Sequence, residues 1–344
     1  MAKRIRVSID AGTTYYTLPG NTGDLKNDAG TLDDTIFGQD FSSTQTGLIN
    51  WTVSANALFK GFAGYVATIK KGGTPTAFTD EAFTLVSGKT YKITDATKNM
   101  WSRGVVPTFK DNAVAVSAAN ILSIDYLFGR VTFVSSYTPT GPITGSGSYV
   151  PSAAIGCTNA FTLSQKANAN DVTCMTDAQA NNGNREFDYG LKTVSLELKG
   201  IYKAADAFLA ALKTRAEVII EINPDGSGKS VARGYFKPTS TDFSGKVGDL
   251  EASTVMYMLS VPDDALVPYP FAWLHTATTL NTGVVNLLTA WASNEIVDIQ
   301  YLPDGTNGFH GQAVVTDISL AGGLEAMNEF TVNFQGSGDT TAVP

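Results

Sequence analysis

The residue types that most often carry catalysis are scarce in this chain. It has two histidines, His275 and His310, and each stands beside an apolar or aromatic neighbour with no Ser or Cys and acidic partner close in sequence. A His-based hydrolase needs a nucleophile, an imidazole and an acid brought together. Both histidines are therefore expected to be ordinary loop or surface residues, and the chain is not predicted to be an enzyme.

Metal-ligand patterns are equally weak. Cys157 and Cys174 are the two cysteines, without a second Cys pair or nearby histidines, so free thiols are predicted and a zinc site is not. The Asp- and Asn-rich segment 166–188 lacks the ligand spacing and the closing bidentate Glu of a calcium loop. The expectation is no catalytic residue, no metal and no cofactor.

Glycine-rich segments at 144–149 ("TGSGSY") and 224–229 ("PDGSGK") superficially resemble phosphate loops. The first lacks the lysine and helix of a nucleotide loop, and the twin of the second, "PDGTNG" at 303–308, has no lysine. Asp-Gly favours tight turns between strands. Both Pro-Asp-Gly segments are therefore predicted to be hairpin turns, and 138–151 is predicted to be a linker.

Several carboxylates fall on the faces of predicted strands: Glu197, Glu217, Glu221, Asp298 and Glu329. One interpretation is a solvated outer face. The other is an acidic wall that faces a channel. With a formal charge of −8 and a pI near 4.8, the chain should repel nucleic acid on average. The charge makes some channel-facing carboxylates plausible but does not choose between the interpretations.

The elements that position these residues are duplicated. Residues 207–226 align without a gap on 286–305, and both segments end in Pro-Asp-Gly. Beyond a turn that is two residues shorter in the second copy, 234–259 overlies 311–336, with Phe243 on Leu320. A length change confined to a turn is typical of duplication followed by drift.

Each copy is predicted to contain a short helix, a strand, the Pro-Asp-Gly turn, a strand, a polar turn and a final strand. The helix of the first copy is predicted over 205–213, with Asp206 near its start and Lys213 at its end, where their charges suit the helix dipole. Alternation predicts strands in which Val218, Ile220 and Ile222 share one face.

A strand at 187–202 feeds the first helix, whereas 263–283, before the second helix, is predicted to be loop-like. The missing strand has a weaker match at 47–58, aligned with 190–201. The predicted domains are therefore 1–69 with 263–344, a β-rich insertion and linker at 70–150, and 151–262. Three serial units with an incomplete third remain an alternative.

The segments "GLKTVSLELKGIY" (190–202) and "VIIEINPDG" (218–226) and the ending "GQAVVTDISLAGGLEAMNEFTVNFQGSG" (311–338) resemble the major tail tube proteins of bacteriophages with long, flexible, non-contractile tails. "SIDYLFGRVTF" (123–133) resembles a segment found in a subset of them. The resemblance implies a mainly β (α+β) fold, with two tail-tube-type β-sandwich domains that each carry a short flanking helix, plus the small β-rich insertion.

The same resemblance implies a virion protein, located in the tail and assembled in the host cytoplasm. Its rings would stack into the tail tube through which the genome is delivered. Because the chain holds two copies, homo-trimeric pseudo-hexameric rings are expected, with a homo-hexamer as the alternative. The implied partners are further copies of the chain, the tape measure protein, tail terminator and tail-tip proteins, and double-stranded DNA that passes without sequence-specific binding; no membrane is implied. The polar segments 19–46 and 165–186 are predicted as loops for ring-to-ring contacts.

A different class of function remains open. A virion decoration protein or cell-surface β-module that binds a receptor or carbohydrate would also be β-rich and non-enzymatic. It would be expected to expose an aromatic cluster, and the four tryptophans are not grouped in sequence.

Overall fold

The structure is a computed structural model that describes residues 3–36, 41–155, 158–201, 213–214, 216–244, 252–261, 269–276 and 280–343. It is mostly β, with few and short helices, as predicted. The chain divides into unit 1 (Met1–Val66, Ala160–Glu197 and Ala277–Pro344) and unit 2 (Ala67–Asn159 and Leu198–Thr276). Within the described ranges, no helix is long and apolar enough to cross a membrane.

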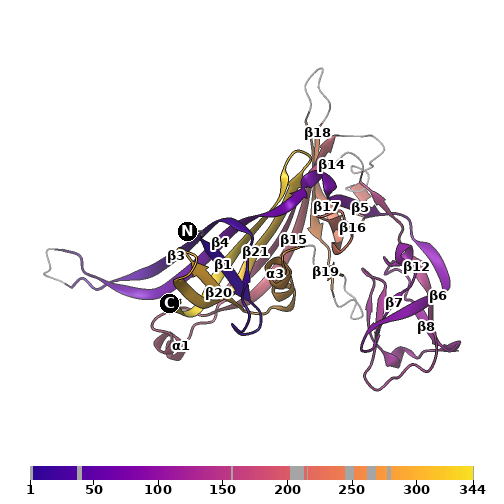
Figure 1. Cartoon of the computed structure of the whole chain (residues 1–344), viewed down its shortest axis with the longest axis horizontal. Coiled ribbons are helices and arrows are strands. Elements are labelled where there is room, and N and C mark those ends of the chain that lie inside the picture. The colour runs from indigo at the N-terminus through magenta and orange to yellow at the C-terminus, as the bar shows by residue number, and fades with distance from the viewer. Residues whose placement is uncertain are drawn as a thin grey trace. The chain divides into compact units, whose positions relative to one another are not determined.

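Unit 1 is built on long antiparallel strands (Figure 1). Its strands are β1 (Arg4–Ser8), β2 (Tyr16–Thr17), β3 (Gly20–Asp33), β4 (Thr44–Ala63), most of β14 (Thr158–Asp171) and β15 (Phe187–Ile201), β20 (Val297–Leu302), β21 (Gly308–Gly323) and β22 (Met327–Val343). Its helices are η1 (Gly64–Val66), α1 (Met175–Ala180) and α3 (Thr282–Ser293). The pairing order runs β3-β4-β22-β21, and β21 also pairs with β20 and with β14, which neighbours β15.

The two faces of this sheet differ in polarity. In β22, Phe330, Val332 and Phe334 are buried, whereas Thr331 and Asn333 on the other face are half-buried. This confirms the predicted alternation, because successive side chains of a strand point to opposite faces. The apolar face forms the core of unit 1, and α3 packs on β1 and β21 (Figure 1).

Helix α3 is the helix predicted for the second copy. Its N-cap Asn281 accepts a hydrogen bond from the backbone N–H of Gly283 at 2.8 Å, and it ends at Asn294, whose φ of 62° lies in the left-handed region. Val284, Leu287 and Trp291 bury its apolar stripe. The helix predicted over 205–213 in the first copy lies, except for its last residue, outside the described residues.

Two glycines make room for the indole of Trp51, which is buried in unit 1. A Cβ at Gly336 would lie 2.0 Å from the indole ring, and a Cβ at Gly311 would lie 2.7 Å from it. The Trp51 indole N–H donates a hydrogen bond to Gly338 O at 3.0 Å. These glycines therefore serve close packing, because a side chain at either position would displace the ring.

Unit 2 contains the insertion and a second group of strands that includes β16, β17 and β18 of the first copy. The strands of this group are β5 (Thr68–Gly72), β13 (Ser152–Ala154), β16 (Val218–Asn223), β17 (Ser230–Ser244), β18 (Ala252–Leu259) and β19 (Phe271–His275), in the order β13-β5-β16-β17-β18 with β19 on β17. Strand β19 corrects the expectation that 263–283 is loop-like. It was missed because its five residues directly follow Pro268 and Pro270 and carry no clear alternation.

The insertion forms a seven-stranded sheet in the order β10-β11-β7-β6-β12-β8-β9. These strands are β6 (Thr76–Ser87), β7 (Thr90–Ile93), β8 (Thr108–Asp111), β9 (Val114–Ala115), β10 (Ile121–Asp125), β11 (Arg130–Phe133) and β12 (Ile143–Tyr149), with the short helices η2 (Ala96–Lys98) and η3 (Ala118–Asn120). Half of the segment 138–151, expected to be a linker, is therefore β12, a strand whose glycines leave room for the aromatic rings of Phe78, Phe83 and Phe109.

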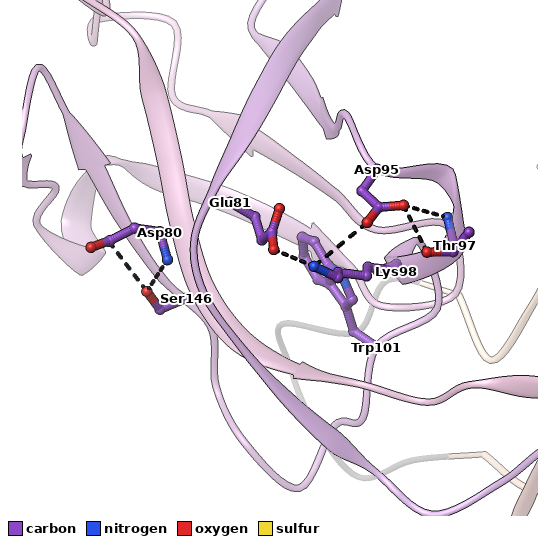
Figure 2. Close-up of polar contacts among 7 residues, drawn as sticks. All are labelled: Asp80, Glu81, Asp95, Thr97, Lys98, Trp101 and Ser146. Atoms are coloured by element: carbon purple, nitrogen blue, oxygen red, sulfur yellow. Dashed lines mark hydrogen bonds and ion pairs between the residues drawn. The ribbon is translucent and has the colours of Figure 1, made fainter.

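The core of the insertion is aromatic and centres on Trp101, whose side chain is fully buried. The Trp101 indole N–H donates to Lys98 O at 2.8 Å, and the Lys98 ammonium pairs with Glu81 and with Asp95 (Figure 2). Asp95 also caps η2 by accepting from the Thr97 N–H at 3.0 Å. These contacts hold the turn before Trp101 against β6, which fixes the indole in the core.

The strand pairing bears out the internal repeat. Strands β16 and β17 form a hairpin through the first Pro-Asp-Gly turn, as β20 and β21 do through the second. The register of β17 on β18 shifts between Pro238 and Ser240, and that of β21 on β22 shifts between Val315 and Asp317. The sequence alignment places these two shifts at the same position. A bulge kept in both copies indicates that they share one backbone.

Candidate assembly site

One strand pair in unit 1 joins segments that the predicted domain boundaries place in different copies of the repeated unit. Strand β14, from the predicted segment 151–262, pairs antiparallel with β21, from 263–344, over Ala160–Lys166 and Asp317–Gly323, and Leu163 lies opposite Leu320. We call this pair the internal joint. Both leucines are buried, at 0% and 1% exposure. Main-chain hydrogen bonds and an apolar contact therefore connect one copy to the next.

The internal joint also brings opposite charges together on its polar face. Lys166 lies directly opposite Asp317. Burial raises the pKa of Asp317, and the positive charge of Lys166 opposes that rise. A Lys–Asp pair across two antiparallel strands favours one register over its neighbours, because a slip would separate the charges.

Glu221, one of the predicted channel carboxylates, is buried in unit 2 with 4% exposure. Arg233 Nε and Nη2 donate to its Oε2 at 2.8 and 2.5 Å, and Lys70 Nζ lies 2.9 Å from Oε1. Burial alone would raise the pKa of Glu221, but the charges of Arg233 and Lys70 outweigh burial and hold the pKa below its ordinary value.

Arg233 also ties the insertion to the repeated unit. Its Nη1 donates to Leu127 O at 2.6 Å and to Asn99 O at 3.2 Å. All of Ile219–Asn223 is buried, so β16 does not alternate between core and solvent as predicted. The reason is that the insertion's aromatic core covers the face that carries Ile219. Glu221 therefore does not present its charge to solvent in this chain.

Glu217 is held in the same region by a bidentate ion pair. Arg103 Nε and Nη2 donate to its two carboxylate oxygens at 2.9 and 2.6 Å. The Arg103 guanidinium also lies 5.2 Å from the ring centroid of Tyr235. Burial raises the pKa of Tyr235, so its hydroxyl stays neutral beneath the guanidinium. The Glu217 charge is thus already paired with a residue of the insertion.

Asp298, His310 and Thr341 form a hydrogen-bonded chain across neighbouring strands of unit 1. His310 Nε2 lies 3.3 Å from Asp298 Oδ1, and Nδ1 lies 3.3 Å from Thr341 Oγ1. Sequence reasoning missed this acid–imidazole–hydroxyl arrangement because its three residues are far apart in sequence and come together only when β20, β21 and β22 pair. Both contacts are long for hydrogen bonds, and His310 lies directly opposite Thr341 in the ladder. Cross-strand packing accounts for the arrangement.

The other histidine, His275, lies in β19. Its ring stacks on Trp273 with centroids 5.6 Å apart, and Nδ1 lies 3.1 Å from Ser230 Oγ. Burial lowers the pKa of His275, which favours the neutral imidazole. Cys174 is a free, exposed thiol, and Cys157 lies outside the described residues. Within the described ranges, no group of three or more His, Cys, Asp or Glu could hold a metal ion.

The remaining predicted carboxylates are less enclosed: Glu197 is half-buried and Glu329 is exposed. Glu329 lies opposite Ala321 of β21 on the polar face of the sheet. Other half-buried side chains of this face are mostly neutral hydroxyls and amides: Thr52, Ser54, Thr162, Ser164, Ser319, Thr331, Asn333 and Gln335. The face is therefore polar with scattered charges rather than a continuous acidic wall.

Sequence reasoning missed β3 and the end of β14. Segments 19–46 and 165–186, expected to be polar loops, contain β3 and the end of β14. Their polar composition misled the prediction, because most of the residues of these segments are not buried even where they form strands. A usable signal was the leucine at the same position of each strand, Leu25 and Leu163.

No protein-family model and no curated protein matches the chain. Among solved structures, it is similar to a chain in the tail of an empty gene transfer agent (GTA) particle determined by helical refinement with C6 symmetry, at 20% identity and a TM-score of 0.30, covering 37% of this chain and 87% of that one. A chain in the virion of a native GTA particle is similar at 20% identity and TM-score 0.30, covering 37% and 89%. Similarity at this level assigns neither a family nor a function to this chain.

Proposed function

We propose that this protein is a structural subunit of a bacteriophage tail tube and that its copies assemble side by side into rings. The observation that carries the proposal is the internal joint, in which one copy of the repeated unit is bonded through its backbone to the next copy. A contact that joins one copy to the next in a constant direction is heterologous, and such contacts build rings or filaments when repeated.

The proposed ring is a trimer of chains, with six repeated units and pseudo-sixfold symmetry; a ring of six chains is the alternative. The repeated units are proposed to follow the sequence boundaries, 1–69 with 263–344 and 151–262. The insertion at 70–150 is proposed to be attached to the unit 151–262. Arg233 and Arg103, which bind the insertion to β16 and β17, support that attachment. The number of copies per ring rests on the sequence resemblance and the duplication.

In this proposal the polar face of the sheet lines the channel. A wall of hydroxyls and amides with few charges, in a chain of net charge −8, would not hold DNA phosphates. Glu329 and Glu197 are the predicted carboxylates that we retain as channel-facing. The tape measure protein, the tail terminator and tail-tip proteins and the passing DNA are the remaining proposed partners, within a tail assembled in the host cytoplasm.

Negative-stain microscopy of the purified full chain tests the proposal. The expected result is hollow rings or tubes, in which each ring contains an even number of repeated units. Particles that stay monomeric under all salt and protein concentrations tested would contradict it. That result would instead favour a decoration or receptor-binding module, although three of the four tryptophans that could form a binding patch, Trp51, Trp101 and Trp291, are buried.

A further inference from the structure

Strands β3 and β14 occupy equivalent places in the two copies. Each is 14 residues long, and aligned end to end they share a leucine, Leu25 with Leu163, and a closing aspartate, Asp33 with Asp171. Other identities in this alignment are Asn21 with Asn159 and Ala29 with Ala167. Each strand is followed by a return strand, β4 or β15, with which it is paired in the sheet.

The turns after these two strands contain the same hydrogen bonds. Asp33 Oδ1 accepts from the Thr35 N–H at 3.0 Å, and Asp171 Oδ1 accepts from the Thr173 N–H at 3.0 Å. The Thr35 hydroxyl then accepts from the N–H of Ser43 at 2.8 Å. In the other hairpin, the Thr173 hydroxyl accepts from the N–H of Glu186 at 2.8 Å. Matching side-chain caps fix the alignment of β3 on β14 independently of the strand sequences.

This equivalence exposes an asymmetry between the two hairpins. In the described part of the chain, β14 pairs with β21, whereas β3 pairs with β4 alone. The equivalent of Leu320 is Phe243, in the last residues of β17. Ser240–Ser244 are paired on one side with β18, and no other described strand of this chain pairs with them. Within the described residues, one joint of the repeated unit is made inside the chain, and the backbone edges at the equivalent positions pair with no second strand there.

The side chains at these edges are exposed where their equivalents are buried. Leu163 and Leu320 of the internal joint are buried, whereas Leu25 is half-buried and Phe243 is 36% exposed. Long edge strands that carry apolar side chains are templates for pairing with another chain. A partner strand on these edges would bury Leu25 and Phe243 as the internal joint buries the two leucines.

Charge supports the same pairing. Transferring the register of β14 on β21 to the equivalent residues places Leu25 opposite Phe243 and Lys26 opposite Asp242. The side chain of Asp242 is exposed, and that of Lys26 is exposed and forms an ion pair with Asp28 of the same strand. The internal joint carries one Lys–Asp pair across its strands, and the transferred register creates one as well.

We propose that two copies of this chain bind each other by antiparallel pairing of Asp24–Asp28 of β3 in one copy with Ser240–Ser244 of β17 in the next. The pairing reproduces the internal joint between chains, with Leu25 against Phe243 and Lys26 against Asp242. It rests on the proposed function, because a ring needs such a contact, and it adds the register. The pairing begins at Asp24 because Gly23 O already accepts a hydrogen bond from Lys3 Nζ at 2.7 Å.

Disulfide trapping between two differently labelled chains tests the register. The background is the full chain with Cys157→Ser and Cys174→Ser. A Lys26→Cys chain is mixed with an Asp242→Cys chain, oxidised mildly and run on a non-reducing gel. The matched control mixes Lys26→Cys with Ser244→Cys, which lies on the same face two residues away. Opposite residues of antiparallel strands have Cα atoms about 5 Å apart, which is within disulfide range. The Cα atoms of residues two positions out of register are roughly 8 Å apart, which is too far for a disulfide.

The Lys26→Cys/Asp242→Cys mixture is expected to form a covalent dimer about tenfold faster than the control, because only its cysteines lie within disulfide distance. The same samples are viewed by negative-stain microscopy. Rings without the in-register dimer, or with equal trapping in the control, would overturn this pairing and leave the proposed function standing. Neither rings nor dimer would count against both.

A charge-exchange pair gives a second measurement that does not depend on disulfide chemistry. Lys26→Asp places two acidic groups opposite each other and is expected to lower the extent of assembly at low salt. Lys26→Asp combined with Asp242→Lys restores opposite charges and is expected to recover it. Failure of the double variant to recover, with both variants folded, would contradict the Lys26–Asp242 contact.

Discussion

The same two positions of the repeated unit carry different residues in its two copies. Glu221 and Arg233 lie opposite each other in β16 and β17 of the first copy, and Gln300 and His310 lie opposite each other in β20 and β21 of the second. The residue on the adjoining strand is basic in both: Lys70 pairs with Glu221, and Arg6 Nη1 donates to Gln300 Oε1 at 3.1 Å. The copies thus keep the geometry of this site and change its charge.

The insertion explains the difference. In the first copy it covers β16 and β17, and Arg233 reaches two of its backbone carbonyls. A guanidinium placed in a core requires a carboxylate beside it, because an unpaired buried charge is costly. In the second copy the equivalent residues, Gln300 and His310, are half-buried and carry a neutral amide and an imidazole. The copy that is covered by the insertion therefore carries a buried ion pair where the other copy carries half-buried, neutral polar groups.

Removing the buried arginine is expected to produce the largest effect. Arg233→Met leaves Glu221 enclosed with only Lys70 as counter-charge and frees the carbonyls of Leu127 and Asn99, so the free energy of unfolding should fall by about 3 kcal/mol. Urea unfolding of the full chain at pH 7 measures it. His310→Gln at the equivalent position of the second copy is the matched control, and an equal loss there would contradict the role given to the insertion.

The pH dependence sharpens the same comparison. The pKa of Glu221 is held below its ordinary value of 4.5, so its contribution to stability is complete above about pH 4.5 and is lost as the pH falls through the folded-state pKa. Glu221→Gln, which gives the first copy the residue of the second, should remove this part of the acid sensitivity. A stability difference between wild type and variant that stays constant from pH 7 to pH 3 would contradict it.

The two equivalent leucines give the next largest effect. Leu163→Ala removes a fully buried side chain from the internal joint and should lower the free energy of unfolding by about 2–5 kcal/mol. Leu25→Ala, at the half-buried equivalent, should cost the unassembled chain less than about 1 kcal/mol but weaken its assembly. Urea unfolding of the isolated chain and ring yield by microscopy separate the two. Equal unfolding losses would show that β3 is already packed like β14.

The smallest effect is expected on the polar face. Glu329→Lys changes an exposed strand residue and should alter the free energy of unfolding by no more than about 0.5 kcal/mol. If Glu329 faces the channel, particles carrying Glu329→Lys should assemble but release DNA more slowly. The control is Glu329→Ala, which introduces the residue found at the equivalent position of the first copy, Ala252. Unchanged release kinetics for the lysine variant would contradict a channel-facing Glu329.

Local patterns predicted much of the repeated unit. The Pro-Asp-Gly hairpins, the alternation of β22 and helix α3 follow from turn chemistry and side-chain periodicity, which act between near neighbours. The duplication was readable because both copies kept the same apolar positions. Strand β3 was not predicted, because "GNTGDLKNDAGTLD" has the composition of a loop and is extended only through pairing with β4.

The candidate site divides in the same way. The sequence determined which residues are acidic and that several lie in strands, since charge and alternation are local properties. Only the tertiary structure decided that Glu221, Glu217 and Asp298 are already engaged, because their partners Arg233, Arg103 and His310 reach them across strands or from the insertion. It also decided that β14 meets β21. Backbone pairing between distant segments depends on register and burial, which no single segment encodes.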